Sequence, residues 1–128
     1  MRILFAVGVL AFSFASCARA TEWLECSDGD KASFRVLLGQ MSVIAVNDIV
    51  IEVGSREWST TAGKGTLITK GQAFETTDQI LIDVIDEAFD KIVARLRVFK
   101  ASDKNDDVTA GTLQMPDVGV WAVTCTGP

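Results

Sequence analysis

The chain has 128 residues, no histidine, no tyrosine and a formal net charge of −5 at pH 7. Such a charge repels the phosphates of nucleic acids and anionic lipids, so the composition argues against both as partners. The lack of histidine removes the commonest general base and metal ligand, and every serine–histidine or cysteine–histidine catalytic pair. A glycosidase-type carboxylate pair needs no histidine, but nothing singles out two of the 17 acidic residues. We therefore expect a protein that is not an enzyme and has no cofactor or metal.

The first 20 residues predict export. Arg2 precedes an apolar segment, residues 3–14, which is too short to cross a bilayer as a helix. Residues 18–20, Ala-Arg-Ala, have the small-x-small pattern of a signal-peptidase site. We expect a mature protein of residues 21–128 in the periplasm or outside the cell. Loss of Arg2 and Arg19 would change the net charge from −5 to −7.

A second cleavage site stays open as an alternative. Residues 14–17, Phe-Ala-Ser-Cys, resemble a bacterial lipobox, although that pattern prefers Leu at its first position. Cleavage there would lipidate Cys17 and anchor the protein in an envelope membrane. Only in that form do we expect contact with a membrane.

The first part of the mature segment predicts short strands in which apolar and polar residues alternate. Residues 27–30 form a turn, Asn47-Asp48 a tight hairpin turn, residues 54–65 a polar loop, and Gly71 a pivot between two strands. The strands expected here are residues 23–26, 32–38, 42–46, 49–53, 65–70 and 72–76.

The second part predicts two longer hairpins. Its strands are residues 79–85, 91–100, 108–115 and 118–125. Arg95 and Arg97 alternate with apolar residues, so residues 91–100 have one charged and one apolar face. Pro116 falls in the last turn, where its missing N–H costs nothing. The whole pattern predicts one all-β domain of about eight to ten strands, either a small antiparallel barrel or a sandwich, since both limit exposed edges.

Two cysteines remain in the mature segment, Cys26 and Cys125. In an oxidising compartment an isolated pair predicts a disulfide. A redox pair would more often have C-x-x-C spacing. The bond would tie the first strand to the last.

The three tryptophans predict different roles. Trp121 shares a strand face with Cys125 and should pack on the disulfide, and Trp23 should cover one end of the domain. Trp58 lies in the predicted polar loop and has two interpretations. It is either an exposed anchor for a partner or a loop residue folded onto the core.

An acidic stretch between the predicted strands of residues 91–100 and 108–115 is a candidate calcium site. Asp103, Asn105 and Asp107 alternate like the first ligands of an EF-hand loop. Val108 and Gln114 then stand where that loop needs Gly and Glu. We expect a solvated turn instead. The same interpretation applies to the acidic residues of the preceding hairpin, Asp83, Asp86, Glu87 and Asp90.

Four parts of the sequence, Cys26, residues 33–36, residues 65–75 and Cys125, together resemble the membrane-bound inhibitors of c-type lysozyme. The resemblance implies a small periplasmic or lipid-anchored β-barrel clamped by a disulfide. In that family a lysine of a Thr-Lys-Gly segment enters the lysozyme cleft with a serine from a Ser-Gly-Ala-x-Tyr loop. Lys70 matches the lysine, whereas the serine loop has no counterpart, because Ser-Thr-Thr-Ala-Gly occupies its place without a tyrosine.

We therefore expect an exported envelope protein that acts by binding. The first hypothesis is a protein-binding module similar to a lysozyme inhibitor, with Lys70 and Trp58 as candidate binding residues. Its acidic charge suits a basic protein partner. The alternatives are a structural or stress-related periplasmic protein and a small barrel that holds an apolar ligand.

Overall fold

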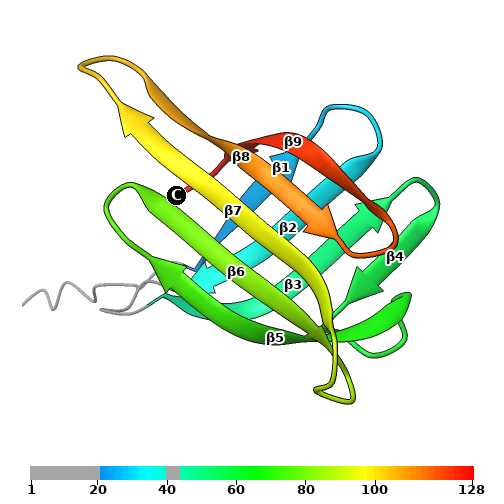
Figure 1. The fold of residues 1–128 in the computed structure, drawn as a ribbon. Helices are drawn as coiled ribbons and strands as arrows, with labels where there is room; N and C mark the ends of the chain where they lie inside the picture. The colour runs from blue at the N-terminus through cyan, green and yellow to red at the C-terminus, as the bar shows by residue number, and fades with distance from the viewer. Residues whose placement is uncertain (1–20, 40–43) are drawn as a thin grey trace, which may run out of the picture.

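A computed structural model describes residues 21–39 and 44–128, which form a closed barrel of nine strands (Figure 1). Each strand pairs with the next, and β9 pairs with β1 to close the barrel. The pairs are antiparallel apart from β4 and β5, which run parallel. The strands are β1 (Glu22–Ser27), β2 (Ala32–Gly39), β3 (Ala45–Val53), β4 (Arg56–Ser59), β5 (Thr66–Glu75), β6 (Gln79–Asp86), β7 (Ile92–Ser102), β8 (Asp107–Met115) and β9 (Gly119–Thr126).

This architecture confirms the all-β prediction and selects the barrel over the sandwich. The predicted signal segment of residues 1–20, including Cys17, lies outside the described residues, as do residues 42–43 of one predicted strand.

The barrel interior is filled by one face of each long strand. In β2, for example, buried residues alternate with partly exposed ones, so Phe34 and Val36 point inward and Arg35 outward. The same alternation sends Leu96 of β7 into the core. The largest fully buried side chains are Phe34, Leu24, Ile49, Ile51, Ile68, Ile80, Ile82, Leu96, Leu113 and Met115. Burial of this apolar surface is the main force that closes the barrel.

The predicted disulfide is confirmed. Cys26 and Cys125 are direct partners in the β1–β9 pair, and their sulfurs are bonded at 2.05 Å. Trp121 packs against the core, on the face that the sequence predicted. The prediction for Trp23 is wrong: it lies on the outer side of β1, 38% exposed, with the Arg35 guanidinium 5.9 Å from its ring centroid.

Two predicted breaks are irregularities within continuous strands. Asn47-Asp48 is not a hairpin turn, because β3 runs straight through it. Leu37 pairs with Asp48 and Leu38 with Val46, so Asn47 is an extra residue in a bulge. Likewise β5 continues past Gly71, with a register shift between Lys70 and Ala73.

The predicted loop of residues 54–65 contains a strand. Its four residues, Arg56–Ser59, pair with β3, and Trp58 lies opposite the buried Ile51. Only Trp58 among these four residues is apolar, so they show no alternation that would identify a strand in sequence. This short strand carries Trp58, for which the sequence allowed two interpretations. Trp58 is only 5% exposed, so it is folded onto the core.

The β1–β2 turn depends on one carboxylate, and this gives a testable acid response. Asp28 accepts backbone hydrogen bonds at 2.9 Å from Ala32, Asp30 and Lys31. These bonds, that from Ala32 first, lower the pKa of Asp28 below its ordinary value. Because the folded pKa is the lower one, the turn is stabilised above the unfolded pKa and loses that support as pH falls through the folded pKa, below about pH 4.

We expect the ¹³C shift of the Asp28 carboxyl group to titrate at lower pH in the folded protein than in a peptide of residues 26–32. Exchange of the Ala32 amide should accelerate over the same acid range. Equal titration midpoints in protein and peptide would contradict this account of the turn.

Candidate functional site

The barrel has two ends with different chemistry. We call one the hairpin end, formed by the connections at residues 76–78 and 103–106, and the other the pocket end, formed by the turns at residues 87–91 and 116–118. In Figure 1 the β7–β8 hairpin projects beyond its neighbours at the upper left, and the turns of the pocket end lie to the right.

Exposed apolar side chains gather on the outside of the strands that lead to the hairpin end. Phe74 is 68% exposed, Phe99 59% and Val108 57%. Phe74 lies opposite Leu81, and Phe99 lies opposite Ala110. We call this surface the outer wall and define it by six residues: Phe74, Leu81, Phe99, Ala101, Val108 and Ala110. Gln79 and Arg97 lie among them, opposite Phe99 and Leu81. Exposed apolar side chains gathered on one face and bordered by polar residues are a feature of interaction sites.

The outer wall ends at an acidic tip. Its six residues carry no charge, whereas the adjoining turn and the start of β8 contain Asp103, Asp106 and Asp107 with a single cation, Lys104. Asp103 and Asp106 exchange backbone hydrogen bonds that close this turn. Over residues 21–39 and 44–128 no group of three or more acidic or cysteine side chains is arranged to hold a metal ion. The tip therefore offers negative charge to a partner beside an apolar surface.

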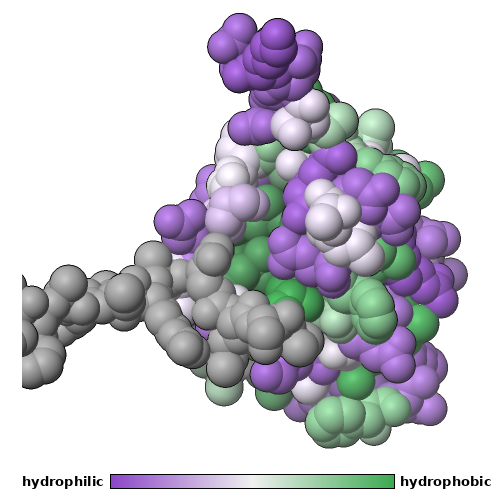
Figure 2. Space-filling model, turned by 90° about the vertical axis from the view of Figure 1, so that its left-hand side faces the viewer, coloured by the Kyte–Doolittle hydropathy of each residue, from purple (hydrophilic) through white to green (hydrophobic). Residues whose placement is uncertain are grey.

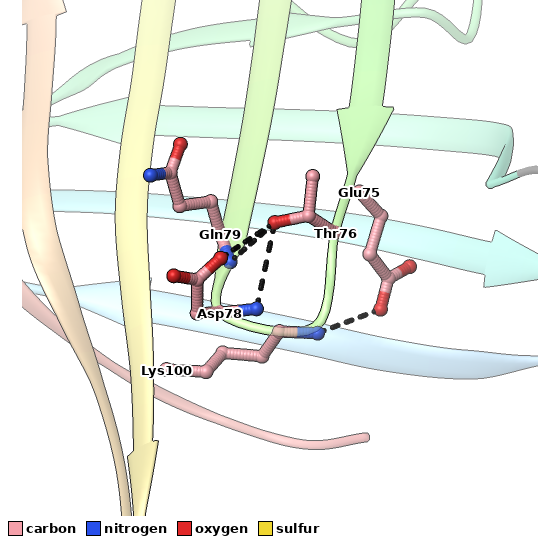
Figure 3. Close-up of polar contacts among 5 residues, drawn as sticks. All are labelled: Glu75, Thr76, Asp78, Gln79 and Lys100. Atoms are coloured by element: carbon pink, nitrogen blue, oxygen red, sulfur yellow. Dashed lines mark hydrogen bonds and ion pairs between the residues drawn. The ribbon is translucent and has the colours of Figure 1, made fainter.

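A set of polar contacts holds the base of the outer wall (Figure 3). The Lys100 ammonium lies 2.8 Å from a carboxylate oxygen of Glu75, so an ion pair joins β7 to β5 across the start of β6. The Lys100 backbone N–H donates to the Asp78 carbonyl at 2.8 Å. The Thr76 hydroxyl accepts from the Gln79 N–H and donates to the Asp78 carboxylate. These contacts fix the strands that carry Phe74 and Phe99.

Figure 2 looks onto the hairpin end. A hydrophilic lobe stands at the top of this view, at the height of the β7–β8 tip in Figure 1. Hydrophobic surface shows between the hydrophilic areas below it. The hairpin end therefore combines a projecting hydrophilic lobe with apolar surface.

Lys70, the candidate from the sequence, closes a seam in the barrel. β4 pairs with β3 only along Val50–Val53, so β3 continues past the end of β4. Lys70 is exposed on β5 and its ammonium donates to the Val46 carbonyl of β3 at 3.1 Å. Thr60 continues the pairing on the same side, because its N–H donates to the Ile49 carbonyl. Lys70 thus has a structural contact that spans the gap left by a short strand.

Trp58, the second candidate, lies far from Lys70's contact, at the pocket end. A pocket of about 540 Å³ opens there between β4 and the β6–β7 and β8–β9 turns. Trp58 and Met115 supply apolar lining, and Arg56, Lys91 and Arg95 supply positive charge. The Arg56 guanidinium stacks over the Trp58 ring, 4.6 Å from its centroid. The structure does not bring Lys70 and Trp58 together in one site.

Sequence reasoning missed the outer wall and the pocket. The wall had a readable signal, because Phe74 and Phe99 are aromatic residues on the outward side of predicted strands. The pocket had none, because Arg56, Lys91 and Met115 come from three separate segments that only the closed barrel brings together.

Among the described residues no helix is long and apolar enough to cross a membrane. Comparisons with protein-family models, curated proteins and solved structures find no match to this chain.

Proposed function

We propose that this chain is an exported, non-catalytic protein that binds a basic protein partner through its outer wall. The carrying observation is the pair of exposed phenylalanines on the strands beside the acidic tip: Phe74 is 68% and Phe99 59% exposed. The disulfide supports export, because such bonds persist in oxidising compartments.

Association would remove the two aromatic rings from water. Complete burial of a phenylalanine side chain stabilises by about 1.5–3 kcal/mol. Both residues stand on paired strands that the Glu75–Lys100 ion pair ties together, so little backbone freedom is lost on binding. The carboxylates of the tip add long-range attraction for a positively charged partner, which raises the association rate.

The resemblance to lysozyme inhibitors makes c-type lysozyme, a basic protein, the first partner to test. A lysine that enters an enzyme cleft has to leave its other contacts. For Lys70 this means breaking the 3.1 Å hydrogen bond that spans the barrel seam. We therefore assign the main contact to the outer wall, and a role of Lys70 in the cleft stays a separate prediction.

Mature protein at micromolar concentration should bind c-type lysozyme and slow lysis of a cell-wall substrate. Phe99→Ser should weaken binding at least tenfold, because it removes an aromatic side chain from the wall. Phe89→Ser is the matched control, since Phe89 is 72% exposed in the β6–β7 turn at the pocket end. Titration by calorimetry, with unfolding curves for each variant, measures both effects.

Three outcomes separate the hypotheses. Absence of both binding and inhibition ends the lysozyme assignment. Equal loss of affinity in Phe99→Ser and Phe89→Ser contradicts the outer wall as the contact. Loss of inhibition in Lys70→Ala, with Phe99→Ser unaffected, moves the contact to the barrel seam.

The alternative of a barrel that holds an apolar ligand has less support. The interior of the barrel is occupied by side chains such as Phe34, Ile51 and Leu96, which are fully buried in one core cluster. A structural or stress-related role would use the same outer wall with another partner.

A further inference from the structure

The pocket end carries a second feature that the proposed function does not use. The pocket has a volume of about 540 Å³, within the range of sites that hold small molecules. Trp58, Met115, Ile92 and Val118 supply its apolar lining. The outer wall leads to the opposite end of the barrel, so a ligand here would not compete directly with a partner there.

The cations of this pocket, Arg56, Lys91 and Arg95, form no ion pair with the protein's own carboxylates at salt-bridge distance among the described residues. The two ion pairs present there belong to Arg97 and Lys100. No side-chain hydrogen bond of these three cations is found there either. In a chain with an excess of acidic residues, three unpaired cations around one cavity are an unusual local balance.

Two carboxylates line the pocket, Asp86 and Asp117, and Asp86 already accepts hydrogen bonds within the protein. Asp86 accepts hydrogen bonds from the backbone N–H groups of Asp90 at 2.8 Å and Lys91 at 3.3 Å, so it closes its own turn. Besides these hydrogen bonds, that from Asp90 first, the Lys91 charge also lowers the pKa of Asp86. Asp117 is exposed in the β8–β9 turn. Arg56 and Arg95 therefore retain the greater capacity for an external anion.

Arg56 is placed for this task by Trp58. The contact with the indole at 4.6 Å restricts the guanidinium, and within the described residues its N–H groups donate no hydrogen bond. A held guanidinium loses less freedom when it binds a carboxylate, and the planar fork matches both carboxylate oxygens. The indole itself is 5% exposed, so the stack rests on the core rather than on a mobile loop.

We propose that the pocket end binds a small amphipathic carboxylate, whose anionic head pairs with Arg56 and whose apolar body lies against Ile92 and Val118. Lys91 and Arg95 add positive charge around the head group. The pocket volume of about 540 Å³ suits an apolar part the size of one aromatic ring with a short linker.

The test uses the purified, disulfide-bonded protein and two isosteric probes, 4-phenylbutyrate and its neutral amide. Calorimetry and ¹H–¹⁵N spectra should show saturable binding of the acid at submillimolar concentration, with shifts at the pocket end. The amide should bind at least tenfold more weakly. Raising the salt concentration should weaken the binding of the acid and leave the binding of the amide unchanged.

Two matched variants locate the head group. Arg56→Gln should weaken the binding of the acid at least tenfold. Arg35→Gln is the control, because Arg35 also lies near a tryptophan, Trp23, but is outside the pocket. It should leave the binding of the acid unchanged. Should Arg56→Gln disturb the fold, Arg95→Gln provides the second variant, with an expected loss of at least threefold.

Equal affinity for acid and amide, equal loss in Arg35→Gln and Arg56→Gln, or no binding of 4-phenylbutyrate up to 10 mM would each overturn the proposal. A peptide with a free C-terminal phenylalanine, compared with its amidated form, identifies the source of the carboxylate. Tighter binding of the free peptide than of 4-phenylbutyrate would assign the site to polypeptide ends and overturn the small-molecule assignment.

Discussion

Replacement of both cysteines, Cys26→Ser with Cys125→Ser, should lower the free energy of unfolding by about 2–5 kcal/mol. The bond joins residues 99 positions apart, so it restricts nearly the whole unfolded chain. It also supports the pair that closes the barrel, since β1 and β9 share only three paired positions, Glu25–Thr126 to Ser27–Thr124. Equilibrium denaturation of the double variant measures the loss.

Changing both cysteines avoids a free thiol, which would confuse the comparison. Wild-type protein reduced under denaturing conditions and refolded in reductant is the control, and it should lose a similar amount. A loss below about 0.5 kcal/mol, the usual range of surface substitutions, would show that strand pairing alone closes the barrel.

Gly111→Ala should cost about 3 kcal/mol, at the upper end for overpacking. Gly111 lies on β8 opposite Val98, where β7 comes unusually close. An added Cβ would sit 1.9 Å from the Arg97 carbonyl oxygen and 2.7 Å from the Val98 Cα. Both contacts are to backbone, so no side chain can turn aside and the two strands would have to separate.

Thr112→Ala is the control for this substitution, because Thr112 is the exposed neighbour of Gly111 on the same strand. It should change stability by less than about 0.5 kcal/mol. The denaturation midpoint should fall for Gly111→Ala with little change in slope. Equal stability of the two variants would mean that β7 and β8 tolerate wider spacing than the structure has.

Much of the fold could be read from the sequence because its signals are local. The alternation along β2, β6 and β7 predicts strands with one buried face, and the two cysteines predict the clamp between the ends. The choice between barrel and sandwich could not be read, because both need the same alternation. It depends on whether β9 returns to β1, which is a property of the whole chain.

The errors have a common physical origin. Asn47-Asp48 and Gly71 are residue types that suit turns, yet the same types are tolerated where a strand bulges. The interrupted strand pairing also explains why the role of Lys70 was not predicted. Its hydrogen bond to Val46 spans a gap between β3 and β5, and no local sequence pattern indicates that gap. The two candidate binding residues chosen from the sequence are therefore a lysine with a structural hydrogen bond, Lys70, and a core tryptophan, Trp58.

The surfaces differ in how far sequence reasoning could reach. Phe74 and Phe99 stand at outward positions of strands that the sequence predicts, so an exposed aromatic wall could have been inferred. The pocket could not, because the positions of Arg56, Lys91 and Arg95 relative to one another depend on barrel closure.

The measurement that tests the central claim most directly is a ¹H–¹⁵N titration of the mature protein with c-type lysozyme. The account predicts shifts or broadening concentrated on the outer wall and tip, at Phe74, Phe99, Val108 and Asp106, with the pocket end unaffected. Perturbation confined to the surroundings of Lys70 or Trp58, or none at equimolar lysozyme in the hundred-micromolar range, would contradict it.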